Sequence, residues 1–110
     1  MNELRGQLEA SLKSALRARD GVAAGVLRST LGAIDNASAV EGPDRYRPRL
    51  GVGACEAARR ELSIEEMRGI VRAEVADRTS AADEYERLGR PAESDRLRAE
   101  AAVRERFTRP

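Results

Sequence analysis

The sequence predicts an all-α fold, a small four-helix bundle of two helical hairpins joined by a Gly/Pro-rich middle loop. Apolar residues recur every three or four positions over four segments, which is the spacing of amphipathic helices. The strict alternation of apolar and polar residues that is typical of strands does not occur. Two prolines and three glycines fall within residues 42–53, so we expect a loop at about 41–62. A length of 110 residues suits one domain, residues 1–110.

The first hairpin is expected from helices at Glu3–Arg19 and Gly21–Val40. Asn2 and Asp20 are the expected N-caps, because their side chains can accept hydrogen bonds from free first-turn amides. The turn between the helices is short, which favours antiparallel packing. The expected apolar stripe of the first helix comprises Leu4, Leu8, Leu12, Ala15 and Leu16. That of the second comprises Val22, Val26, Leu27, Thr30, Leu31, Ile34 and Ala37.

The second hairpin is expected to begin at Ser63, because Ser63 and Glu66 have the spacing of a capping box. This third helix should run to Gly89, a C-cap residue, and Pro91 suits the first turn of a fourth helix. The expected stripe of the third helix comprises Met67, Ile70, Val71, Val75, Ala81, Ala82, Tyr85 and Leu88. That of the fourth is thinner and comprises Leu97, Ala101, Val103 and Phe107.

Composition limits the classes of function. The 20 basic and 19 acidic residues give a net charge of +1, which is not typical of a general nucleic-acid binder. The only aromatic residues are Tyr46, Tyr85 and Phe107, too few for a platform on which bases stack. No apolar run approaches the ~20 residues of a membrane span, and the charged first residues do not resemble a signal peptide. We therefore expect a cytoplasmic location and no membrane contact.

The sequence predicts no catalytic, cofactor or metal site. Cys55 is the only cysteine and the chain has no histidine, so this thiol lacks the usual base and is interpreted as inert. The glycines of residues 51–53 lack the lysine and hydroxyl residue of a phosphate-binding loop. A metal site is not expected without histidine or a calcium-loop pattern.

Charged residues interrupt the apolar stripe of the third helix. Glu74 and Arg78 lie on its packing face, where unpaired charges cost several kcal/mol each. We interpret them as a structural ion-pair network, with Arg28 of the second helix as the candidate third member. Two alternatives are a groove that meets a partner or RNA phosphate, and an acid–base pair. A carboxylate beside arginines is a poor proton carrier at neutral pH, which disfavours the second alternative.

Four arginines are candidate contacts to RNA or another partner: Arg28, Arg78, Arg87 and Arg90. The last two lie at the corner between the third and fourth helices, where several basic residues gather. Acidic residues are interleaved with them, so a self-paired and solvated surface is the competing interpretation.

Three stretches, in order along the chain, resemble the GatB/YqeY family. LRSTLGAIDN at residues 27–36 is similar to the family's LR-x-L-x-AI-x-N helix, and ELSIEE at 61–66 to its ELTDEE helix start. EVADR at 74–78 with YERLGR at 85–90 looks like its KE-x-x-QR and F-x-x-AGR segments. GVGA at 51–54 also looks like the insert of compact bacterial members.

The resemblance implies the N-terminal helical domain of a YqeY-like protein. Family members include stand-alone proteins and the C-terminal region of GatB, a subunit of the amidotransferase that corrects mischarged tRNA; that region contacts tRNA and performs no chemistry. Full-length members continue into a second small subdomain after the fourth helix. The expected function is thus a non-catalytic accessory or binding module linked to tRNA-dependent amidotransferase (carbon–nitrogen ligase) function. Its partner would be tRNA or a protein of tRNA metabolism. The alternative is a helical protein-interaction module without a nucleic-acid role. The oligomeric state does not follow from the sequence.

Overall fold

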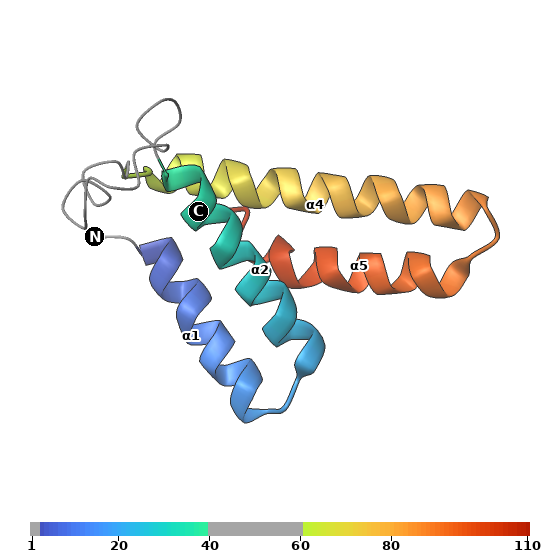
Figure 1. The fold of residues 1–110 in the computed structure, drawn as a ribbon, viewed down its shortest axis with the longest axis horizontal. Coiled ribbons are helices and arrows are strands. Elements are labelled where there is room, and N and C mark those ends of the chain that lie inside the picture. The colour runs from blue at the N-terminus through green and yellow to red at the C-terminus, as the bar shows by residue number, and fades with distance from the viewer. Residues whose placement is uncertain (1–2, 40–60) are drawn as a thin grey trace, which may run out of the picture.

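Four helices form two hairpins in a computed structural model that describes residues 3–39 and 61–110 (Figure 1). Helices α1 (Glu3–Arg17) and α2 (Gly21–Ser38) make the first hairpin, and α4 (Ile64–Arg87) and α5 (Pro91–Glu105) make the second. The all-α class and the pairing into two hairpins are confirmed. No helix in the described part of the chain is long and apolar enough to cross a membrane.

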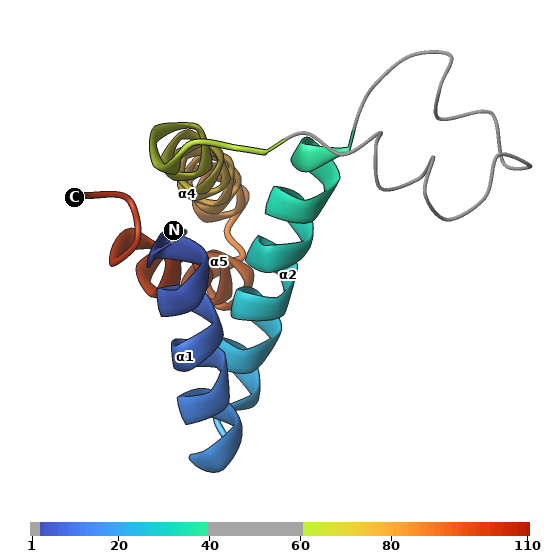
Figure 2. The same ribbon diagram turned by 90° about the vertical axis from the view of Figure 1, so that its left-hand side faces the viewer.

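The two hairpins cross instead of lying alongside each other. In Figure 1 the long α4–α5 hairpin passes across the upper part of α1 and α2, and Figure 2 shows it nearly end-on. Each hairpin therefore has a tip that extends away from the other. Contacts between the hairpins come from α2 against both α4 and α5, and from α1 against α4.

The core lies at this crossing. Leu8, Ile34 and Val71, from three different helices, are completely buried. Burying one such side chain contributes roughly 1.5–3 kcal/mol, so these residues hold the hairpins together. Other buried members of the same cluster are Leu4, Ala15, Ala24, Leu27, Met67 and Phe107.

Three residues expected in the core are exposed. Leu16, Val22 and Leu88 retain 47%, 55% and 62% of their side-chain surface, so their assignment to the apolar stripes was wrong. All three lie near hairpin tips, where Figure 1 shows two helices without a third to cover them. The spacing of apolar residues along one helix does not show where another helix stops covering it.

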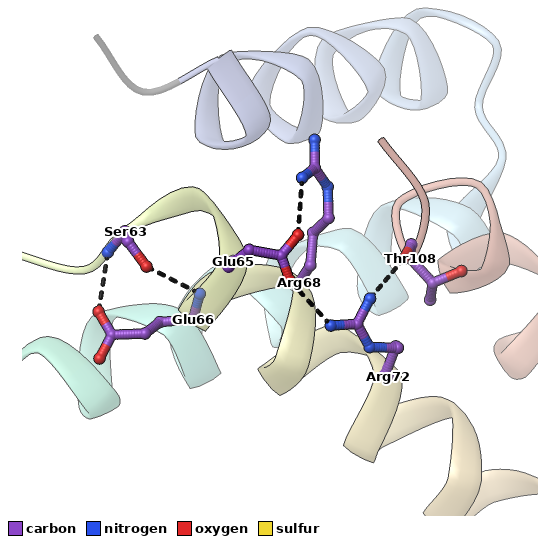
Figure 3. A network of polar contacts seen from close by, with 6 residues as sticks. All are labelled: Ser63, Glu65, Glu66, Arg68, Arg72 and Thr108. Atoms are coloured by element: carbon purple, nitrogen blue, oxygen red, sulfur yellow. Dashed lines mark hydrogen bonds and ion pairs between the residues drawn. The ribbon is translucent and has the colours of Figure 1, made fainter.

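The capping box at the start of α4 is present as expected (Figure 3). The Glu66 amide donates to Ser63 Oγ at 3.0 Å, and the Ser63 amide donates to Glu66 Oε1 at 2.9 Å. About two turns further on, Arg72 donates to the carbonyl oxygen of Thr108 at 2.8 Å. This contact ties the end of the chain to α4. The other expected cap, Asp20, accepts from the Ala23 amide at the start of α2.

Both tight turns use a residue with a left-handed backbone. Gly89 has φ +74°, and the Arg90 amide donates to the Tyr85 carbonyl at 2.9 Å, the pattern of a Schellman motif. At the first turn the corresponding residue is Arg19, with φ +57°, and the Asp20 amide donates to the Ala15 carbonyl at 2.9 Å. Helix α1 therefore ends at Arg17, before the expected Arg19.

Several sequence predictions lie outside the described residues. These are the Asn2 cap, the end of the second helix at Val40, the glycines of residues 51–53, Cys55 and most of the loop expected at 41–62.

Substitution at the two left-handed positions should have opposite effects on stability. A side chain costs about 1 kcal/mol or more at such a backbone, so Gly89→Ala should lower the free energy of unfolding by about 1 kcal/mol. Arg19→Gly should raise it by about 0.5–1 kcal/mol. Urea unfolding followed by circular dichroism measures both. Arg17→Gly, two residues earlier within the helix, is the matched control and should destabilise. A loss of stability in Arg19→Gly would contradict the turn assignment.

Candidate functional site

The largest fully buried side chain is a charged one, Arg104. It lies near the end of α5 with only 1% of its surface exposed. Position 104 continues the spacing of Leu97 and Ala101 along the packing face of α5, so the helix places the guanidinium inside the molecule. A buried arginine requires ionic and hydrogen-bond partners from its surroundings.

Arg104 is surrounded by polar groups from three helices. Its Nη2 lies 3.2 Å from Glu74 Oε1 on α4 and 3.5 Å from Ser29 Oγ on α2. Its Nη1 donates to the Glu100 carbonyl oxygen at 3.3 Å, one turn earlier on α5. Arg104 thus connects the α4–α5 hairpin to the α1–α2 hairpin.

A second arginine, Arg78, completes the charged cluster. Its Nη2 lies 3.7 Å from Glu74 Oε1, and its Nε lies 3.5 Å from Glu100 Oε1. We call Glu74, Arg78, Glu100 and Arg104 the ion cluster; Arg104 is buried and the other three side chains are partly exposed. Two cations and two carboxylates alternate within it, so each charge has a neighbour of opposite sign.

The surroundings of Arg104 do not fully compensate for the burial of its charge and hydrogen-bond donors. Burial lowers the pKa of this guanidinium, and repulsion from Arg78 adds to the shift, whereas Glu74 and Glu100 oppose it. Arg104 Nε and Glu74 Oε1 are both buried without a well-aligned hydrogen bond in the described residues. Glu74 Oε1 is within ion-pair distance of both arginines. Charge attraction therefore holds it near them, without an aligned hydrogen bond.

The sequence located two members of this cluster and assigned a wrong third. Glu74 and Arg78 lie together, but Arg28 is exposed and has no ion pair within residues 3–39 and 61–110. Its neighbour Ser29, a helical step of 100° further round α2, contacts Arg104 instead. The sequence signal for Arg104 was its position in the apolar spacing of α5.

An open pocket of about 350 Å³ adjoins the cluster and lies between the start of α2 and residues of α4 and α5. We call it the wedge pocket. On α2 it is lined by the first two turns and Ser29, and opposite them lie three arginines and one glutamate. The lining residues are Gly21, Val22, Gly25, Val26, Ser29, Arg78, Arg96, Glu100 and Arg104.

The other candidate arginines are paired at the surface of the α4–α5 tip. Arg87 forms an ion pair with Glu84, and Arg90 Nη2 lies 2.8 Å from Glu93 Oε2. The Arg90 guanidinium also lies 5.4 Å from the centre of the Tyr85 ring, a cation–π contact. The hydrogen bond from Arg90 lowers the pKa of Glu93. The structure therefore does not bring Arg28, Arg87 and Arg90 to the pocket that Arg78 lines.

Comparison with known proteins adds no relative. No protein-family model matches the chain, and no curated protein matches it either. The GatB/YqeY resemblance stays a prediction from the motifs. The described residues hold no group of three or more histidine, cysteine, aspartate or glutamate side chains placed to bind a metal ion.

The ion cluster gives a stability prediction. Glu74→Gln leaves Arg104 buried without its nearest carboxylate and should lower the free energy of unfolding by about 2–3 kcal/mol. Combining it with Arg104→Met removes the stranded charge, so the double variant should be more stable than Glu74→Gln alone. Urea unfolding of the two single variants and the double variant measures the coupling.

Glu84→Gln is the matched control, since Glu84 is an exposed acid of the same helix and is also paired with an arginine. It should change the free energy of unfolding by no more than about 0.5 kcal/mol. Strictly additive losses in the double variant would show that Glu74 and Arg104 do not interact.

Proposed function

We propose that this chain is a non-catalytic accessory or binding module of the GatB/YqeY type, working in the cytoplasm with tRNA-dependent amidotransferase function. The observation that supports binding is the wedge pocket, where Arg78, Arg96 and Arg104 line one open space. Arginines present several fixed donors that match the geometry of phosphate oxygens. RNA is the partner that this lining favours.

A binding role suits the chemistry of the pocket better than a catalytic one. Its carboxylate, Glu100, lies 3.5 Å from Arg78 Nε, and the nearby Glu74 lies between two arginines. Both carboxylates are thus paired with arginines, an arrangement that suits electrostatic anchoring.

The second candidate is a helical protein-interaction module without a nucleic-acid role. An open groove of about 590 Å³ favours it, because α1, α2 and α5 line this groove mainly with small and apolar side chains. These side chains include Ala15, Leu27 and Phe107. An apolar groove of this kind suits a helical segment of another protein.

Bulk tRNA distinguishes the two candidates. In a gel-shift titration at low salt, the proposed function predicts a retarded band that weakens steeply as salt is added, because phosphate binding releases counterions. Arg87→Gln should leave the shift unchanged, since Arg87 lies at the α4–α5 tip and is paired with Glu84. No shift at roughly tens of micromolar protein would reject the RNA function and leave the protein-interaction module.

A further inference from the structure

We propose that the wedge pocket is a phosphate-binding site, in which the arginines of α4 and α5 hold one phosphate group against the glycine-containing face of α2. This assignment deepens the proposed function, on which it rests for the identity of RNA as a partner. The phosphate group belongs either to an RNA backbone or to a small phosphorylated molecule, and both present the same oxygens.

Arginine charge is the first observation behind this site. Arg78, Arg96 and Arg104 line the pocket, against the carboxylates of Glu100 in its wall and Glu74 behind it. One positive charge is therefore in excess. It is carried most freely by Arg96, which is exposed, forms no ion pair or hydrogen bond with another described residue and interacts with Glu93 only through longer-range charge attraction. This exposed guanidinium would attract an anion that enters the pocket.

Arg104 is the second observation. It lines the pocket although almost its whole side chain is buried, and its Nε has no hydrogen-bond partner among the described residues. A buried donor without an acceptor costs about 1–3 kcal/mol. A phosphate oxygen is an acceptor that would satisfy such a donor, because it also carries the opposite charge.

The third observation is the lining on α2. Gly21 and Gly25 occupy the first turns of this helix, and no atom lies within 4 Å of the position that a Cβ would take at either residue. The packing of the fold therefore does not require glycine at these positions. Glycine is present there even though alanine would make the helix more stable. The missing side chain at both positions leaves space in the pocket beside α2.

The start of α2 adds a favourable field. Its first-turn amides include those of Gly21 and Val22, which line the pocket, and helix N-termini attract anions. The cap Asp20 binds the Ala23 amide and is not part of the pocket lining. The helix end alone would not define a site, but Gly21 and Val22 of its first turn line the same pocket as the arginines.

A glycine-to-alanine pair separates ligand binding from helix stability. Gly25→Ala puts a methyl group into the pocket, whereas Gly32→Ala adds one on the same helix, outside the pocket and with equal free space. Both should raise the melting temperature, because alanine favours helix. Only Gly25→Ala should weaken phosphate binding, by about tenfold, because its methyl group takes pocket space that the phosphate would occupy. Arg96→Gln should weaken it similarly.

Binding is measured by two-dimensional NMR titration of the full chain with inorganic phosphate, at constant ionic strength kept with chloride. Saturable shifts of the Gly21 and Gly25 amides are expected in the wild-type chain and in Gly32→Ala. Absence of these shifts, or equal affinity in Gly25→Ala and Arg96→Gln, would overturn the assignment.

Two further titrations identify the source of the phosphate. A nucleoside monophosphate that binds more tightly than inorganic phosphate, while tRNA gives no gel shift, indicates that the ligand is a small molecule. This result rejects the RNA function and supports the phosphate site. A tRNA shift that is lost in Arg96→Gln indicates an RNA backbone. A tRNA shift unchanged in both pocket variants rejects the pocket and leaves the proposed function intact.

Discussion

The contact between the buried guanidinium of Arg104 and the groups around it organises both the packing and the pocket of this protein. Arg104 reaches Glu74 on α4 and Ser29 on α2 from its own position on α5. Apolar burial supplies most of the attraction between the hairpins, but it is not directional. A buried charge is directional, because it tolerates only arrangements that keep its partners near. The observed crossing of the hairpins places Ser29 of α2 next to Arg104, whose acidic neighbours lie on α4 and α5.

Much of the fold follows from local sequence signals. The capping box at Ser63, the cap at Asp20 and the turn glycine Gly89 define helix ends through hydrogen bonds made within a few residues. Such signals are readable because the interacting groups are neighbours in the chain. Arg19 was missed because its left-handed backbone is imposed on a residue type that rarely adopts it. The exposure of Leu16 and Leu88 depends on where the second hairpin crosses, which no local pattern contains.

The candidate site was only partly predictable for the same reason. Glu74 and Arg78 stood out as charges on an apolar face of one helix. Choosing their partner required knowing the rotation of α2 and the register of α5, both of which are tertiary. A shift of one residue on a helix turns a side chain by 100°, enough to exchange Arg28 for Ser29 at the contact. The pocket itself is formed between residues of both hairpins, and its glycines carry no motif that the sequence alone would single out.

Packing and binding therefore meet at one residue. Arg104 contacts Ser29 of the other hairpin, pairs with Glu74 of its own hairpin and lines the wedge pocket, and its buried Nε has no hydrogen-bond partner among the described residues. The central claim is that this guanidinium is charged and buried within the native protein. Side-chain nitrogen NMR measures this directly through the exchange of the Arg104 Nε proton with water, with Arg104→Met used to assign the signal. We predict one arginine Nε–H signal that exchanges far more slowly than those of the surface arginines. Exchange of the Arg104 signal as fast as that of Arg87 would contradict the account.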